Sequence, residues 1–494
     1  MLVAKVNADL YRYEIDALIH AFYPGEEVRT VLAGQAVPEV QANKKSCGGT
    51  EDEPAFLSVE YEEDCIGMLF SDEQGVRRFA ALPGELKEAG IRFDRRSPET
   101  KDALKHLLYE SLQDITGHDL PWGELIGVRP TKIATKQLQN GASINEAALY
   151  MQKRHYVSED KAMLAARIAQ TELDILDSNV LGDGYSLYVG IPYCPSTCLY
   201  CSFPSYPAAG AAGQIKAYLE ALHEELAMIA DMNRGRRLDT VYFGGGTPTA
   251  LSAGELDQLL GKVRELFDTG KVREWTVEAG RPDSITEDKL RVLRDHPVTR
   301  ISVNPQTMND ATLRIIGRGH TAEQTVRAFH MAREAGFDNI NMDMILGLPG
   351  ETAKDVAHTL KEIEELGPDS LTVHSLAIKK GSRMQQYIAE KGYDTVLGAG
   401  STMELAIDSA KRMDMLPYYL YRQKNMTGNQ ENIGFAKNGK YGLYNIIMME
   451  ELQPVAAAGA GSVSKFFEPG RRIVRSDNPK EITAYIEKIK SADR

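Results

Sequence analysis

Three cysteines that lie close together have the clearest chemical potential in this chain. Cys194, Cys198 and Cys201 follow the spacing C-x3-C-x2-C. Three thiolates on one short loop can hold three irons of a cubane [4Fe–4S] cluster and leave the fourth iron open to a ligand with an amine and a carboxylate. A structural zinc site normally takes four protein ligands, and the chain has ten histidines but no second C-x2-C pair. The spacing favours the cluster, with a zinc site or three ordinary buried thiols as the alternatives.

This cysteine spacing is the signature of radical S-adenosylmethionine (SAM) enzymes, and the surrounding sequence resembles theirs. The loop directly follows the strand-like run Tyr188-Val189-Gly190-Ile191. The resemblance implies that the cluster donates one electron to SAM and breaks its sulfonium bond. It also implies that the 5′-deoxyadenosyl radical so formed takes a hydrogen atom from a substrate.

A glycine-rich run, Gly244-Gly245-Gly246-Thr247, follows the next strand-like segment. Glycine permits close backbone approach and unusual φ/ψ values. In radical SAM enzymes such a run meets the amino group of the methionine part of SAM. The alternative is a tight strand-to-helix turn with Thr249 or Ser252 as a helix cap. The position of the run after the cysteine loop favours the SAM-binding role.

Polar residues follow the third and fourth strand-like segments. The carboxylate of Glu278 can accept hydrogen bonds from the ribose hydroxyls of SAM, and Gln306 can bond the same sugar. For Glu278 the alternative is an ion pair with Arg281.

The next connections carry three further polar candidates. Arg318 suits a carboxylate because its guanidinium donates two parallel hydrogen bonds, although a solvated helix end is an equal alternative for Arg318 and His320. Asp343 lies inside an apolar run, where a charge is costly without a partner. We therefore expect Asp343 at the polar mouth of the fold rather than in its packing. The backbone near Ala377 is placed to contact adenine.

The elements that carry these residues alternate between strand and helix. Six successive β-then-α units predict an α/β fold with a parallel sheet and outer helices, and six units fit a partial (β/α)6 barrel better than the eight-fold one. Functional side chains of such folds lie at the carboxyl ends of the strands and in the loops that follow. The predicted strands are residues 186–191, 240–243, 274–278, 300–303, 340–346 and 370–376.

The chain divides into three predicted domains. Residues 1–180 are expected to form an N-terminal α+β accessory domain with a helical linker, residues 181–400 the radical SAM partial barrel, and residues 401–494 a C-terminal α+β extension that covers the substrate. The stretch 122–132, which ends in Gly-Val-Arg-Pro-Thr-Lys, is interpreted as a helix-start loop rather than a ligand site. In the first domain we expect a strand at 2–6, helices at 10–22 and 104–115, a hairpin within 56–70, helices within 147–176 and a linker at 178–184.

Composition limits the cellular context. The formal net charge of −13 gives no reason to expect nucleic acid as a partner. The N-terminus lacks the pattern of a signal peptide and no window reaches the length of a membrane helix, so a cytoplasmic protein without a membrane partner is expected. Of the five cysteines, Cys47 and Cys65 stand alone, and the other three lie within eight positions. In a reducing compartment such a cluster favours metal or redox chemistry over disulfides.

Together the motifs resemble the oxygen-independent coproporphyrinogen III dehydrogenases and their relatives over about residues 183–465. The N-terminal extension with Gly-Val-Arg-Pro-Thr-Lys is most similar to the HemZ branch. Phe203 stands where the well-studied dehydrogenases carry a further cysteine, as in the haem-chaperone relatives. By position, the resemblance implies that contacts to the cluster and SAM fall on Tyr188, Cys194, Cys198, Tyr200, Cys201, Gly245, Gly246, Thr247, Glu278, Gln306, Arg318, Asp343 and Ala377.

The resemblance also implies an activity. The expected reaction is the oxidative decarboxylation of two propionates of coproporphyrinogen III to give protoporphyrinogen IX, a step of porphyrin and haem biosynthesis. An electron donor such as flavodoxin or ferredoxin would then be a partner. The alternatives are a haem chaperone that keeps the cluster and SAM, with His374 as a candidate haem ligand, and a radical methyltransferase or haem-opening enzyme acting on a tetrapyrrole.

A tetrapyrrole with several propionates needs cations near the barrel mouth, despite the net charge of −13. Arginine is the better residue for this task because two parallel N–H bonds fix the orientation of a carboxylate. The candidates all follow strands or lie in the tail. They are Arg318, Lys379, Lys380, Arg383 and Arg422, of which Lys379 and Lys380 are interpreted as only solubilising.

Overall fold

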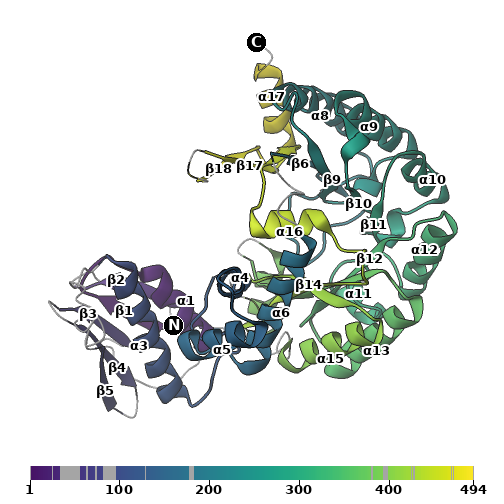
Figure 1. Cartoon of the computed structure of the whole chain (residues 1–494). Helices are drawn as coiled ribbons and strands as arrows, with labels where there is room; N and C mark the ends of the chain where they lie inside the picture. The colour runs from purple at the N-terminus through teal and green to yellow at the C-terminus, as the bar shows by residue number, and fades with distance from the viewer. Residues whose placement is uncertain are drawn as a thin grey trace. The chain divides into compact units, whose positions relative to one another are not determined.

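The computed structural model divides the chain into two compact units, Met1–Val128 with Asn145–Leu164, and Arg129–Ile144 with Ala165–Arg494 (Figure 1). Cys47, Lys380 and most of the predicted linker at 178–184 lie outside the described residues. The structure describes residues 2–24, 26–33, 56–62, 65–72, 75–81, 96–127, 129–176, 183–379, 382–392, 399–423, 426, 429–468, 470 and 472–492.

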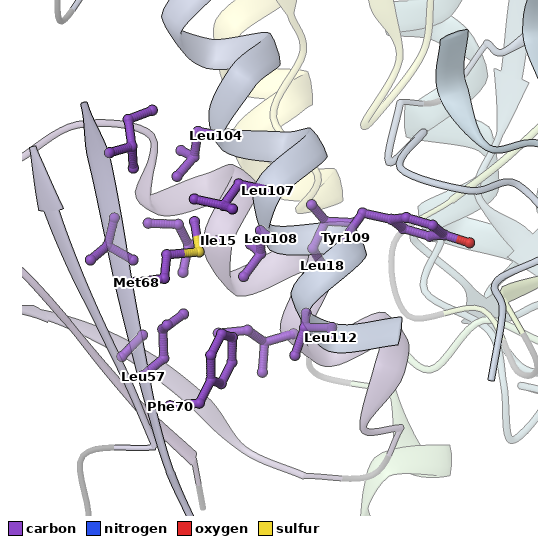
Figure 2. Close-up of a cluster of buried hydrophobic side chains, with 14 of the residues drawn as sticks. Ile15, Leu18, Leu57, Met68, Phe70, Leu104, Leu107, Leu108, Tyr109 and Leu112 are labelled. Atoms are coloured by element: carbon purple, nitrogen blue, oxygen red, sulfur yellow. The ribbon is translucent and has the colours of Figure 1, made fainter. Parts of the chain in front are cut away.

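The first unit contains a five-stranded sheet in the order β2-β1-β3-β4-β5. The predicted hairpin is confirmed, because β3 and β4 pair antiparallel. Apolar residues of α1 and α3, among them Ile15 and Leu108, pack with Met68 and Phe70 of β4 into one core (Figure 2). The elements are β1 (Leu2–Val6), α1 (Arg12–Phe22), β2 (Val28–Leu32), β3 (Leu57–Tyr61), β4 (Ile66–Asp72), β5 (Gly75–Ala81) and α3 (Pro98–Thr116).

Three more helices follow along the chain. They are α4 (Thr131–Gln139), α5 (Ile144–His155) and α6 (Glu159–Ile175). Of these, α5 and α6 confirm the helices predicted within 147–176, whereas α4 precedes that range. Pro130 and Thr131 of the Gly-Val-Arg-Pro-Thr-Lys stretch lie at the start of α4, so its interpretation as a helix-start loop is confirmed. Within the second unit, Arg129 donates to the backbone oxygen of Met449 (2.7 Å) and to Glu451 Oε2 (2.5 Å).

The centre of the second unit is a run of six neighbouring parallel strands, which confirms the predicted partial barrel. Their order is β6-β9-β10-β11-β12-β13, the order in which they follow along the chain. Nearly all their residues are buried, because parallel strands are covered on both faces. The strands are β6 (Tyr185–Ile191), β9 (Leu238–Gly245), β10 (Glu274–Glu278), β11 (Arg300–Ser302), β12 (Ile340–Leu346) and β13 (Ser370–Ser375).

Helices lie between these strands and form the outer layer of the second unit (Figure 1). Reciprocal capping by Ser252 with Glu255, and by Thr321 with Gln324, starts two of them by satisfying backbone N–H groups of the first turn. The outer helices are α8 (Ala212–Met232), α9 (Ala253–Leu266), α10 (Glu287–Asp295), α11 (Asp310–Ile315), α12 (Ala322–Glu334) and α13 (Ala353–Leu366).

The C-terminal part of the chain adds strands to both edges of the parallel run. β15 (Asn432–Ala436) pairs antiparallel with β13, and β16 (Val455–Ala458) pairs parallel with β6. No helix within the described ranges has the length and apolar character needed to cross a membrane. The remaining elements are α14 (Arg383–Lys391), α15 (Ala399–Arg412), β14 (Leu416–Tyr421), α16 (Leu443–Glu450), β17 (Val463–Phe467), β18 (Ile473–Asp477) and α17 (Ile482–Ala492).

Candidate active site

The cysteine loop begins where β6 ends and is closed by a two-residue parallel pair, β7 (Tyr193–Cys194) with β8 (Tyr206–Pro207). Cys194 is buried, Cys198 and Cys201 are half-buried, and none of the three forms a disulfide. The loop is held by backbone bonds from Leu199 N–H to Ile316 O and from Met384 N–H to Leu199 O, both 2.9 Å. Three free thiols on an anchored loop fit the ligand set of a [4Fe–4S] cluster.

Arg281, in the turn after β10, is a buried anchor of this loop. Its guanidinium donates to the backbone oxygen and to the hydroxyl of Ser196, both at 3.0 Å, and pairs with Asp283 at 2.8 Å. Its Nη1 also lies 3.9 Å from the sulfur of Cys198. The alternative in which Arg281 pairs with Glu278 is wrong, since Asp283 is its carboxylate partner.

The glycine run at the end of β9 packs directly on the cysteine loop. Gly246 N–H donates to Ile191 O (2.7 Å), and Thr247 donates from its N–H to Tyr193 O (2.8 Å) and from its hydroxyl to the sulfur of Cys194 (3.4 Å). A Cβ at Gly246 would lie 2.7 Å from the oxygen of Tyr193 and 3.0 Å from that sulfur. Glycine is therefore required for this close approach. Ser252 caps α9, so the predicted helix cap is present beside the close approach of the glycine run.

Tyr242 and Glu278 form a short hydrogen bond on neighbouring strands. The hydroxyl of Tyr242 donates to Glu278 Oε1 at 2.6 Å. Burial raises the pKa of Glu278 to about 7, the Tyr242 hydrogen bond opposes this shift, and the charge of Asp343 adds to it. Tyr444 and Tyr188 stack on Tyr242, with ring centroids 4.4 and 6.1 Å away. Tyr242 was not among the predicted site residues. Because side chains alternate between the two faces of a strand, the apolar neighbours Val241 and Phe243 could have indicated that Tyr242 lies on the opposite face of β9.

Arg318 and His320 are buried, so the alternative of a solvated helix end is wrong for both. Arg318 donates to the hydroxyl of Tyr200 (3.1 Å) and to the backbone oxygens of Gly280 (2.7 Å) and Asn304 (2.8 Å). Burial, together with the positive charge of Arg318, lowers the pKa of His320 to about 3. His320 is therefore neutral, and Arg318 ties three connections together.

Gln306 and Asp343 meet where β11 and β12 end. Gln306 has a φ of +66°. Its backbone N–H donates to the backbone oxygen of Asp343, and its backbone oxygen accepts from Ile345 N–H, both at 3.0 Å. Asn341 Nδ2 donates to Asp343 Oδ1 at 2.6 Å, and His374 Nε2 lies 3.9 Å from Oδ2. Although burial acts to raise it, His374 and the hydrogen bonds to Asp343 hold the pKa of this carboxyl below its ordinary value.

Several buried polar atoms of this region have no hydrogen-bond partner among the described residues. They are Ser302 Oγ, Asn304 Oδ1, Gln306 Oε1 and Arg318 Nε. All four residues line one cavity. Buried polar atoms are normally satisfied, so this set fits a polar ligand such as SAM that supplies the missing partners.

The cavity has a volume of about 380 Å³, which lies within the range of small-molecule sites. Tyr188 is not among its lining residues and contributes through its stacking on Tyr242. The C-terminal part of the chain adds Tyr419, Tyr421, Asn432, Asn445 and Met449 to the wall. The other predicted residues all line it: Cys194, Cys198, Tyr200, Cys201, Gly245, Gly246, Thr247, Glu278, Gln306, Arg318, Asp343 and Ala377.

Of the predicted substrate-binding cations that the structure describes, Arg318 and Lys379 line the cavity. Arg383 donates to the backbone oxygen of Thr197 in the cysteine loop instead. Arg422 is buried and bonds the side chain of Asn429, so its proposed place on the cavity wall is wrong. Arg281 and Arg300 line the cavity without having been named as substrate cations.

Comparison with known proteins agrees with this geometry. The family model "Radical SAM superfamily" matches residues 188–363. The "Oxygen-independent coproporphyrinogen-III oxidase-like protein HemZ" of Bacillus subtilis (strain 168) is 40% identical over 428 residues, which cover 83% of this chain and 85% of the relative.

Two further comparisons cover less of the chain. The "Heme chaperone HemW" of Lactococcus lactis subsp. lactis is 38% identical over 194 residues, which are 39% of this chain and 49% of the chaperone. The solved coproporphyrinogen III oxidase HemN of Escherichia coli, a radical SAM enzyme, superposes with a TM-score of 0.51 at 24% identity, over 63% of this chain and 71% of that one. The chain thus spans about half the length of the chaperone, and the HemN structure supports the fold alone.

Proposed function

Because this chain belongs to the radical SAM superfamily and, within it, to the HemZ-like family, we propose that it decarboxylates propionate groups of coproporphyrinogen III to form protoporphyrinogen IX. Enzymes of this superfamily use a [4Fe–4S] cluster and SAM. The observation that carries the proposal is the single cavity that joins the three cysteines to the polar strand ends and to an aromatic wall. The cysteines and polar strand ends suit the cluster and SAM, and the aromatic wall suits a planar substrate.

Each group of residues has a distinct task in this proposal. The cluster, when bound, supplies the electron that cleaves SAM into a radical able to take a hydrogen atom from the substrate. The cluster is held by Cys194, Cys198 and Cys201. Arg281 fixes their loop through its hydrogen bond to the backbone oxygen of Ser196. Glu278, held by Tyr242, is placed to accept hydrogen bonds from ribose hydroxyls.

The proposed reaction must also balance in electrons. Hydrogen abstraction removes one electron equivalent from a propionate, and loss of CO2 with vinyl formation requires that one more electron leave. A one-electron acceptor must therefore reach the cavity. The C-terminal residues Tyr419, Tyr421, Asn445 and Met449 in the wall support the proposed role of residues 401–494 in covering the substrate.

A second candidate is a haem chaperone on the same scaffold. Phe203 is exposed and lines the cavity, and the HemW relative is 38% identical over 194 residues. His374 also lines the cavity, with Tyr421 OH 3.4 Å from its Nδ1 and Asp343 3.9 Å from its Nε2. Both imidazole nitrogens thus have a protein neighbour, which argues against His374 as a haem ligand.

Product analysis separates these functions. The reconstituted protein is incubated anaerobically with SAM and a reductant, in one sample with coproporphyrinogen III and in a second with haem, and products and bound tetrapyrroles are identified by mass spectrometry. Vinyl products with CO2 support the decarboxylase. Stoichiometric binding of unaltered haem without turnover supports the chaperone, and a methylated tetrapyrrole supports a methyltransferase; either outcome would overturn the decarboxylase proposal.

A further inference from the structure

We infer that Lys379 and Phe203 form a subsite that binds one propionate carboxylate together with the adjoining face of a tetrapyrrole. This inference rests on the tetrapyrrole class of substrate in the proposed function. Lys379 follows β13 by a few residues, and Phe203 stands two positions after Cys201. Both line the cavity, and Lys379 Nζ lies 5.4 Å from the centroid of the Phe203 ring.

The other cations of the cavity wall are already engaged. Arg281 bonds Ser196 and Asp283, and Arg318 bonds Tyr200 and two backbone oxygens. Arg300 donates to the side chain of Asn339 and to the backbone oxygen of Lys440.

Lys379 differs from these three arginines. It is half-buried, and within the described ranges no carboxylate lies within ion-pairing distance of its ammonium group. The charge neighbour of this recessed ammonium is the thiol of Cys201 rather than a carboxylate, so its hydrogen-bond donors can still serve an anionic ligand. Lys379 is therefore the cation on this wall that is available to a substrate carboxylate.

Phe203 supplies the second half of the subsite. The residue is 62% exposed, which is unusual for a large apolar residue beside a cavity. A planar macrocycle can stack on such a ring by offset aromatic packing. In a tetrapyrrole each propionate carboxylate is tied to the ring by two methylenes, so a cation beside an aromatic face matches both parts of the molecule at once.

The neighbouring cysteine loop gives this subsite a role in orientation. Cys201, the last of the three cysteines, lies two residues before Phe203 and lines the same cavity. A propionate held at Lys379 would be fixed near the place where SAM is cleaved. Hydrogen abstraction demands such fixed geometry rather than simple attraction.

The test measures equilibrium binding by fluorescence to the anaerobic, cluster-loaded protein. The probes are coproporphyrin III, a stable tetracarboxylate, and its neutral tetra-amide. Lys379→Met should weaken coproporphyrin III binding by about tenfold or more, since it removes a charge-assisted bond, and should leave tetra-amide binding unchanged. Phe203→Leu should weaken both probes alike, because stacking does not depend on the carboxylates. Lys379→Arg should restore most of the coproporphyrin III affinity.

Matched controls are Lys361→Met, at an exposed lysine on α13, and Phe466→Leu, at a partly exposed phenylalanine on β17. Neither should change binding, and SAM binding should persist in every variant. Wild-type affinity for coproporphyrin III in Lys379→Met would overturn the subsite and leave the proposed function standing. Equal loss of acid and amide in that variant would also overturn it. If the wild-type protein binds SAM but neither porphyrin, the proposed function and the subsite fail together.

Discussion

The hydroxyl of Tyr242 lies 2.6 Å from Oε1 of Glu278, within a wall where Tyr444 stacks on the Tyr242 ring. This bond aims a carboxylate of raised pKa, about 7, into the cavity. The ionised form accepts hydrogen bonds on both oxygens, whereas the protonated form must donate through one of them. The protonation state of Glu278 should therefore control SAM binding near neutral pH.

We predict that the affinity for SAM falls as pH drops below about 7, by up to about tenfold per unit of pH. Tyr242→Phe should move the midpoint upward, because the bond it removes opposes the raised pKa of Glu278. Glu278→Gln should weaken SAM binding and abolish this pH dependence. Isothermal titration between pH 6 and 8 (roughly one unit either side of that pKa) measures both. A flat profile in the wild-type protein would contradict the proposed role.

Arg281→Ala should loosen the cysteine loop. The substitution leaves Asp283 without its guanidinium and frees the backbone oxygen and hydroxyl of Ser196. Because Arg281 is buried but Asp283 is exposed, we expect the loss of this pair and of the bonds to Ser196 to cost about 1 to 3 kcal/mol. We expect a lower melting temperature and less iron per chain after reconstitution.

The control for Arg281 is Arg291→Ala, which breaks the exposed pair of Arg291 with Asp288 on α10. Exposed pairs contribute at most about 1 kcal/mol. Iron content and melting temperature should therefore stay near those of the wild-type protein. Equal iron content in the Arg281 and Arg291 variants would exclude Arg281 as an anchor of the loop.

The barrel strands were predictable from local pattern, but the site was predictable only in part. Parallel strands are buried on both faces, so each reads as a short apolar run, and polar residues at their ends stand out. Glu278 and Asp343 were found in this way. Arg281 was not, because its acceptor Ser196 lies 85 positions away in the sequence and no local pattern encodes that contact.

The edges of the sheet show the same limit. Residues 401–494 were predicted as a separate α+β extension, yet β15 pairs with β13 and β16 pairs with β6. Hydrophobic pattern gives the type of an element but not its partner in the sheet. The predicted position of Arg422 near the barrel mouth depended on the unknown arrangement of the tail. In the structure its side chain bonds Asn429 and does not line the cavity.

Each of Cys194, Cys198 and Cys201 should be essential for the cluster, because the loop offers three thiols and no spare ligand in its anchored part. Single alanine variants should lose most of the iron, the sulfide and the visible absorbance of a [4Fe–4S] cluster, and should not cleave SAM. Cys65→Ala, at a half-buried cysteine of the first unit, is the matched control and should retain all three. Full cluster content in any loop variant would refute the assignment.

Glu124 should make the stability of the first unit sensitive to acid. It is fully buried, and its carboxylate accepts from Lys105 (3.2 Å) and lies 2.8 Å from His155 Nδ1 and 3.3 Å from His106 Nε2. Burial alone would raise the pKa of Glu124, but these hydrogen bonds and charges lower it to about 2. A depressed carboxyl pKa stabilises the fold above the unfolded value of about 4.3, and this contribution is lost as pH falls towards 2.

Glu124→Gln should therefore destabilise the first unit by about 3 kcal/mol at neutral pH, since it leaves the buried Lys105 without its counter-ion. It should also remove much of the stability loss between about pH 4.3 and pH 2. Hydrogen exchange of α3 in the full chain reports this unit specifically. Glu27→Gln, which breaks the exposed pair with Arg29, should change exchange by less than about 1 kcal/mol. The double variant Lys105→Met with Glu124→Gln should recover part of the loss, because no buried charge then stands unpaired; failure to recover any would show that the network stabilises the unit by other contacts.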